Sequence, residues 1–136
     1  MPERSDALSA EERKAIRVRA AELKKREDGD AAVRAIIGDM TPGEQEIALR
    51  IHDAILERVP QLQPKPRYGQ PAYYRDGKVV CFFMAASKYG TTSCTFGFDD
   101  ATLVQDGGVW PSAYGITALG DEDEARLLAL VERAVG

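Results

Sequence analysis

The chain has 136 residues, of which 44% are hydrophobic and 29% are charged, and its formal net charge at pH 7 is -4. This length suits one domain whose core needs no disulfide or metal, and the composition excludes a disordered or fibrous protein. The small negative charge argues against an obligatory nucleic-acid partner, and the apolar runs are too short for a membrane span or a signal peptide. We therefore expect a cytoplasmic protein whose partner is neither a nucleic acid nor a membrane.

The first forty residues predict helices. Ser9 and Glu12 form a capping box that opens a helix running to about Glu27. This helix has one thin apolar stripe, so we expect it to be mostly solvated: Ile16, Ala20 and Leu23. The sequence DGD at 28–30 predicts a break before a shorter helix over 31–37, whose inward residues are Val33, Ile36, Ile37 and Met40. We assign residues 1–40 to a helical extension of a domain at 41–136.

A further helix is predicted to begin after Thr41, which forms a capping box with Glu44 and precedes a proline suited to the first helical position. Its apolar residues recur at helical spacing and predict one buried face: Ile47, Ile51, Ala54, Ile55 and Val59. The helix should end at Val59, because a residue before proline avoids the helical conformation. The segment PQLQPKP at 60–66 is expected to be an extended connector without regular structure.

The next segment predicts a β-hairpin. Asp76 and Gly77 suit a type I′ turn, in which both central residues have positive φ. A regular two-residue hairpin then has three facing pairs on one side: Arg75 with Lys78, Tyr73 with Val80, and Pro71 with Phe82. Val79, Cys81 and Phe83 lie on the opposite side. The second strand is apolar on both sides, so the sequence raises the question of what covers the face that carries Tyr73, Val80, Phe82 and Met84.

Two more strands and a helix complete the chain. Residues 91–98 alternate as a strand with Cys94, Phe96 and Phe98 on one side, and a short helix is expected over 101–104. A last strand within 109–119 is expected at the sheet edge, because Pro111 cannot donate a ladder hydrogen bond. Residues 120–135 form an amphipathic helix whose inner residues are Leu128, Val131 and Val135. The order predicts an α+β two-layer sandwich, an antiparallel sheet of three to four strands packed by helices, with the N-terminal helical extension.

The sequence contains no recognisable catalytic constellation, so we expect a protein that is not an enzyme and needs no cofactor. It lacks the glycine-rich phosphate loops, the GxSxG elbow and the CxxC pair. The single histidine, His52, has no second histidine or cysteine at ligand spacing, and a structural role explains it equally well. Cys81 and Cys94 lie in apolar strand-like runs, where buried free thiols are the common case.

The hairpin region is basic. Between Arg58 and Phe98 there are six basic residues and one acidic residue, Asp76, which gives this segment a charge of +5. Such a segment suits a small anionic or aromatic ligand, held by aromatic and basic side chains of the sheet face. The candidate ligand-binding residues are Tyr68, Pro71, Tyr73, Arg75, Lys78, Lys88 and Trp110. Two alternatives stay open: strands disfavour acidic residues in general, and a helix or a second subunit can cover the same face.

Carboxylates provide a second candidate site. Glu46, Asp53 and Glu57 lie near one stripe of the helix over 42–59, and clustered carboxylates can bind hard cations. Arg50 lies at pairing distance from Glu46 and Asp53 on the same helix, so a solvated helix face with ion pairs is the alternative.

The stretch YGQPAYYRDGKVVCFFMAASKYG, residues 68–90, resembles the YdhG-like family, a domain of unknown function. The resemblance rests on the YGxPAY element at 68–73, the hairpin, the Lys88-Tyr89 loop, and the later FGFDDA and VWPSAYGITAL segments, and it covers roughly residues 41–135. It implies a compact α+β domain. Some members are described as iron chaperones, so iron binding is implied by analogy with the acidic helix surface of frataxin. The chain departs from many relatives at Gln70, where they have methionine.

Two functions follow as expectations. The first is a binding protein that uses its aromatic and basic sheet face for a small ligand or a partner, as a monomer or a homodimer. The second is a frataxin-like iron chaperone with Glu46, Asp53 and Glu57 as ligands.

Overall fold

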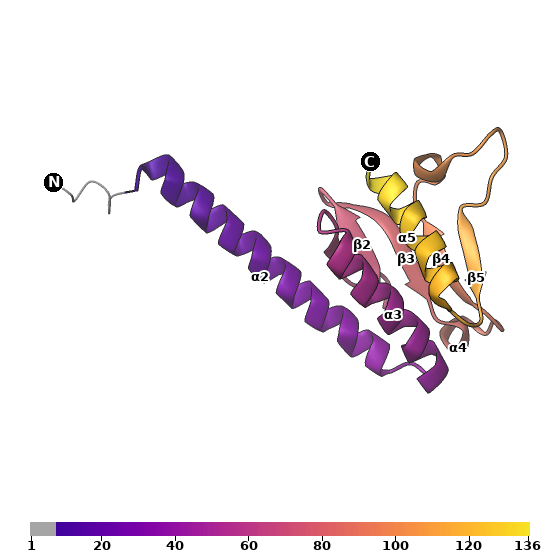
Figure 1. Cartoon of the computed structure of the whole chain (residues 1–136). Coiled ribbons are helices and arrows are strands. Elements are labelled where there is room, and N and C mark those ends of the chain that lie inside the picture. Colours follow the sequence, from indigo (N-terminus) through magenta and orange to yellow (C-terminus); the bar gives the residue numbers. More distant parts are fainter. Residues whose placement is uncertain (1–7) are drawn as a thin grey trace.

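The computed structural model describes residues 8–136 and shows an α+β fold, as the sequence predicts (Figure 1). The sheet is antiparallel with the order β1-β2-β3-β4-β5, and α3 and α5 pack on one of its faces. The helices are α2 (Ala10–Gly38), α3 (Pro42–Arg58), α4 (Ala86–Tyr89), the 3-10 helix η1 (Ala101–Val104) and α5 (Asp121–Val135). The strands are β1 (Gln63–Pro64), β2 (Ala72–Arg75), β3 (Lys78–Met84), β4 (Cys94–Phe98) and β5 (Ala113–Ile116). The first seven residues of the expected extension lie outside the described range.

Helix α2 is continuous, so the predicted break at 28–30 is wrong. Gly29 lies inside the helix where α2 passes β1, and a Cβ atom at this position would lie 1.9 Å from the carbonyl oxygen of Pro64. Asp30 accepts hydrogen bonds from side chains of α2 and α3. Two of the three residues that suggest a turn, Gly29 and Asp30, therefore serve the docking of the helix. This packing outweighs the helix stability of about 1 kcal/mol that glycine costs relative to alanine.

The two halves of α2 have different surroundings. In the C-terminal half, Val33 and Ile37 are buried in the main core, as expected. The N-terminal half extends away from the rest of the fold (Figure 1), and its side chains Ile16 and Leu23 are exposed. The expectation of a mostly solvated helix is confirmed for this half.

The connector after α3 contains a short strand that the sequence does not predict. Gln63 and Pro64 form β1, which pairs antiparallel with Tyr74 and Tyr73 of β2. A proline lacks the N–H group that a central strand needs, which fits the position of β1 at the sheet edge.

The hairpin turn is as predicted, but the register beyond it is not. Asp76 and Gly77 have φ values of 50° and 81°, and Arg75 pairs with Lys78. Tyr73 pairs with Cys81 rather than with Val80, because a β-bulge shifts the register between Tyr73 and Tyr74. Residues 78–84 contain no glycine or proline that would mark a bulge.

The bulge moves Tyr73 to the helix-covered face of the sheet. Directly opposed residues of an antiparallel pair share one face, so Tyr73 lies with Cys81, whereas Phe82 lies with Ala72 on the outer face. Tyr73 is 1% exposed and belongs to the core. The predicted outer-face group of Tyr73, Val80 and Phe82 is therefore wrong, and Val80 is also buried in the core.

The outer face is partly closed by side chains of its own strands and loops. The ring of Phe82 lies over Gly97, where an added Cβ would be 2.7 Å from the ring. The guanidinium of Arg67 lies 4.9 Å from the centre of the same ring and donates a hydrogen bond of 2.9 Å to Asp99. An arginine stacked on an aromatic ring shields it from water. This arrangement removes Arg67 from the set of freely available basic groups.

The short helix α4 lies where the sequence suggests a loop, and the other elements agree with the sequence. Helices α3 and α5 bury the expected apolar residues, including Ile51, Ile55, Leu128 and Val131. Strand β5 lies at the sheet edge, and both cysteines are buried free thiols. No helix among residues 8–136 combines the length and the apolar character that crossing a bilayer requires.

We predict that Gly29→Ala destabilises the protein by more than about 1 kcal/mol, although alanine is the better helix former. The added methyl group would clash with the carbonyl oxygen of Pro64, which is backbone and cannot turn away. Chemical denaturation measures the free energy of unfolding. Gly43→Ala is the matched control, because no atom lies within 4 Å of its Cβ position. A Gly29→Ala protein as stable as the control would contradict this account of α2 docking.

Candidate functional site

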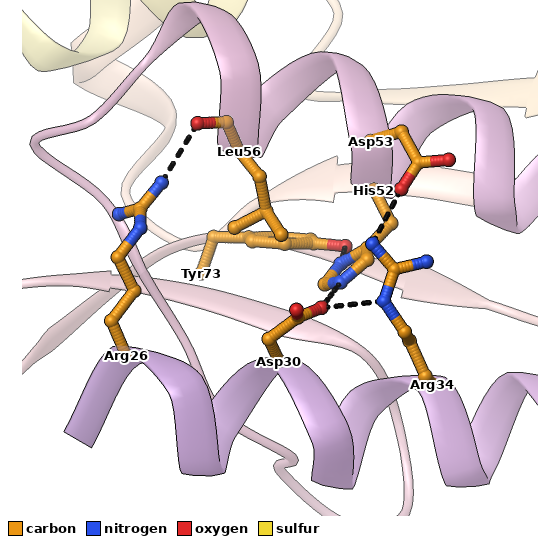
Figure 2. Close-up of polar contacts among 7 residues, drawn as sticks. All are labelled: Arg26, Asp30, Arg34, His52, Asp53, Leu56 and Tyr73. Carbon is orange, nitrogen blue, oxygen red and sulfur yellow. Dashed lines mark hydrogen bonds and ion pairs between the residues drawn. The ribbon is translucent and has the colours of Figure 1, made fainter. Parts of the chain in front are cut away.

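A buried chain of hydrogen bonds joins α2, α3 and β2 (Figure 2). His52 of α3 is fully buried, and its Nδ1 atom lies 2.9 Å from the hydroxyl of Tyr73. Its Nε2 atom lies 2.7 Å from Oδ1 of Asp30. One side chain from each of three elements therefore takes part in a single polar line through the core.

The protonation states of Tyr73, His52 and Asp30 fix which group donates in each hydrogen bond. Burial raises the pKa of Tyr73 well above its ordinary value, so its hydroxyl keeps the proton and donates it to Nδ1 of His52. Burial also lowers the pKa of His52, which favours the neutral imidazole. Burial alone would raise the pKa of Asp30, but the hydrogen bond from His52 and the charge of Arg34 outweigh it, so the pKa is lowered. Nε2–H of His52 thus donates to an ionised carboxylate.

Two arginines of α2 complete the docking surface. Arg34 donates hydrogen bonds to Asp30 at 2.7 Å and to Asp53 of α3 at 2.6 Å. Arg26 donates to the backbone carbonyl oxygens of Leu56, at 2.9 Å, and of Pro60 and Leu62 beyond the end of α3. Figure 2 shows Arg26, Asp30 and Arg34 on the side of α2 that faces α3, at the four-residue spacing that places side chains on one helix face.

Tyr73, His52 and Asp30 are hydrogen-bonded in the order hydroxyl, imidazole and carboxylate, which is also found in proton relays. The hydroxyl of Tyr73, however, is not accessible to a substrate. A nucleophile or general acid needs its reacting atom beside the substrate. Tyr73 is buried under the helices and its proton is directed at His52. The arrangement therefore holds α2 in place and has no access for chemistry.

We predict that His52 stays neutral in the folded protein at pH values where an ordinary histidine is charged. Because its folded pKa is lowered, the unfolded chain binds the extra proton first, so stability is lost as pH falls below the unfolded value of about 6.5. His52 is the single histidine of the chain, so an NMR titration of its ring protons is unambiguous. The midpoint should lie below 6.5. A midpoint at or above 6.5 would show that the ring is charged or solvated in the native state.

A second feature lies at the sequence YGQP, residues 68–71. Tyr68 and Gly69 have φ values of 53° and 69°, and Arg67 pairs with Gln70, so a tight turn precedes β2. The ammonium group of Lys88 donates hydrogen bonds of 3.0 Å to the carbonyl oxygens of both Tyr68 and Gly69. The positive φ favours glycine at position 69, and a Cβ there would lie 2.2 Å from the Lys88 nitrogen, so the ammonium group would have to move.

This turn forms one side of a hollow of about 400 Å³. Residues at the carboxyl end of α2, the end of β3 and α4 also line it. Its apolar lining comprises Ile36, Met40, Pro71, Phe83 and Ala85. Its polar lining comprises Asp39, Gln70, Ser87, Lys88 and Tyr89, with the backbone of Gly69. An apolar hollow with a few polar groups is the usual form of a small-molecule site.

Buried hydrogen bonds hold the polar wall of this hollow. Nε2 of Gln70 donates to the hydroxyl of Tyr89 at 2.8 Å, and Gln70 is only 7% exposed. Oε1 of Gln70 is buried and has no partner among the described residues. The buried carboxylate of Glu44 accepts hydrogen bonds from the backbone and the hydroxyl of Ser87, which fixes the start of α4. The positions of Lys88 and Tyr89 are thereby set by the core.

The hollow carries two charges that no neighbour neutralises. Lys88 forms no ion pair with any carboxylate among residues 8–136, since its partners there are backbone carbonyls. Asp39, at the end of α2, likewise has no side-chain partner in this part of the chain, and the last turn of α2 has no basic residue. A cation and an anion therefore face one cavity.

The structure brings three of the seven predicted ligand-binding residues together. Pro71 and Lys88 line the hollow, and the exposed ring of Tyr68 belongs to the turn that Lys88 holds. Tyr73 is in the core. Arg75 donates to the carbonyl oxygen of Val135 at the end of α5, where the helix dipole favours a cation. This contact gives Arg75 a partly negative neighbour, which offsets its repulsion from Lys78 across the hairpin.

The other two predicted residues lie elsewhere. Lys78 is exposed next to the hairpin turn, and its pairing partner is Arg75. The indole N–H of Trp110 donates to the carbonyl oxygen of Ala101 at 2.8 Å, and its ring lines a separate hollow of about 390 Å³ beside α5. The basic segment is therefore distributed over several surfaces rather than gathered on one sheet face.

The three candidate metal ligands do not converge on one point. Glu46 and Glu57 are exposed on α3, whereas Asp53 binds Arg34. Arg50, expected to pair within α3, instead forms ion pairs with Asp121 and Glu124 of α5. Among residues 8–136, no group of three or more histidine, cysteine or acidic side chains is placed to hold a metal ion.

Sequence reasoning did not identify Asp39, Met40, Gln70 or Tyr89 as site residues. Gln70 and Tyr89 flank residues that it did select, and the glycine at 69 is a local signal for a special turn. No pattern in the sequence marks Asp39 or Met40 as a site residue, because they line the hollow only when α2 is docked on the rest of the fold. A comparison of the chain with protein-family models, curated proteins and solved structures finds no match.

Proposed function

We propose that the protein is a non-enzymatic binding protein that holds a small molecule with an anionic group and an apolar or aromatic body in the hollow at the YGQP turn. The observation that supports this most directly is the ammonium group of Lys88, which two backbone carbonyls hold at the rim of an apolar cavity without an acidic partner. A fixed cation beside apolar side chains suits a carboxylate that carries a hydrocarbon tail.

Two further donors support an anion at this position. The ammonium group of Lys88 has three N–H bonds, of which the two carbonyls use two. The hydroxyl oxygen of Tyr89 accepts a hydrogen bond from Gln70, so its own proton points elsewhere and has no acceptor among the described residues. The free N–H of Lys88 and the O–H of Tyr89 can both donate to one carboxylate.

The apolar side of the cavity sets the shape of the tail. Phe83 of β3 and Ala85 just after it are buried, and Ile36 of α2 and Met40 just after it are half-buried in the same lining. A methionine adapts its side chain to ligands of different shape. Burial of a few methylene groups contributes about 0.8 kcal/mol each, so a tail of several carbons adds usefully to the binding of the carboxylate.

We predict that carboxylates with apolar bodies bind wild-type protein and lose at least about tenfold in affinity with Lys88→Met, because a charge-assisted hydrogen bond contributes about 1.5–3 kcal/mol. The probes are benzoate, hexanoate and L-norleucine, titrated by calorimetry. Amide chemical shifts in an NMR titration locate the site, and those of Gly69, Gln70, Lys88 and Tyr89 should move.

Lys78→Met is the matched control, because it removes the same charge from an exposed position outside the hollow. It should bind like wild type. Lys88→Arg keeps the positive charge but changes the group that holds the YGQP turn. It therefore tests whether a loss of affinity comes from a change in the turn or from the loss of the charge. The proposal fails if none of the three probes binds, or if Lys78→Met weakens binding as much as Lys88→Met does.

A further inference from the structure

Resting on the proposed function, the structure assigns a ligand class to the same hollow: we infer that it takes a zwitterion, a small molecule with a carboxylate, an amine and an apolar chain. The lining of the hollow includes one residue that favours an anion, Lys88, and one that favours a cation, Asp39. Lys88 lies on the side of the YGQP turn, and Asp39 lies at the end of α2.

The cation-favouring side is formed by two features of α2. The carboxylate of Asp39 lines the hollow and has no side-chain partner among the described residues. The carboxyl end of a helix also carries a partial negative charge, and the last turn of α2 contains no basic side chain to offset it. An ammonium group would find both charges at this end of the cavity.

Gln70 contributes a further polar residue to the lining of the hollow. It is more than nine-tenths buried, and its Oε1 atom is itself buried and has no donor in the part of the chain that the structure describes. A ligand reaches this oxygen only after the side chain moves, so the zwitterion assignment rests on Lys88 and Asp39.

Other charged groups near the hollow do not change this assignment. Glu44 lies behind Ser87 and uses its carboxylate on the backbone and hydroxyl of that residue. Arg67 stacks on Phe82 and pairs with Asp99 on the outer face of the sheet. The lining itself contains one cation, Lys88, and one anion, Asp39, so its formal charge is zero.

The test uses isomers and their single-charge fragments. L-norleucine and 6-aminohexanoate have the same atoms but place the amine next to the carboxylate or five carbons away, so together they sample the separation of the two charges. Hexanoate lacks the amine, and hexylamine lacks the carboxylate. Calorimetry on the full chain should show that at least one isomer binds about tenfold or more tightly than both fragments, as expected when a second charged contact is added.

Asp39→Asn should lower the affinity of the better isomer towards that of hexanoate, because it removes the anion that the amine contacts. Glu57→Gln, an exposed acid of α3 outside the hollow, is the matched control and should change neither. If hexanoate binds as tightly as both isomers, or if Asp39→Asn has no effect on the better isomer, the zwitterion assignment is overturned and the proposed anion site stands. If none of the four probes binds, both proposals fail.

Discussion

The placement of α2 depends on one line of hydrogen bonds from Asp30 through His52 to Tyr73. These three groups are contributed by α2, α3 and β2, so a shift of any one element leaves a buried polar atom without its partner. Such an atom costs about 1–3 kcal/mol, a large fraction of the stability of a small domain. The line therefore permits few relative positions of helix and sheet, and Gly29 allows the close approach that it requires.

The hollow at the YGQP turn follows from this docking. Its lining includes the carboxyl end of α2, about two turns beyond Asp30, and the turn that Lys88 holds. Neither wall forms a cavity alone. The same docking places an unpaired carboxylate, Asp39, on the cavity that contains an unpaired ammonium group. The proposed ligand site is thus a consequence of how a helix is anchored nine residues earlier.

The sequence predicted those features that depend on neighbouring residues. The capping boxes at Ser9 and Thr41 and the turn at Asp76-Gly77 are all present, since each needs only local hydrogen bonds or local φ values. It erred where a distant contact reversed a local preference. The segment DGD breaks isolated helices, yet contacts with Pro64 and His52 keep it helical. The hairpin register failed because a single bulged residue, Val80, transfers Tyr73 to the other face.

For the candidate site, the sequence located the YGQP turn and Lys88 but not the arrangement that gives them a cavity. Residue types and short spacings by themselves determined the α+β class, most of the elements and the apolar faces of α3 and α5, because periodicity records which side of an element is buried. Only the tertiary structure decided that Tyr73 is a core donor, that Arg67 and Arg75 are engaged elsewhere, and that Asp39 and Lys88 line one hollow. The physical reason is that these facts depend on packing between residues far apart in the chain, where a bulge or a close helix approach has no local signature.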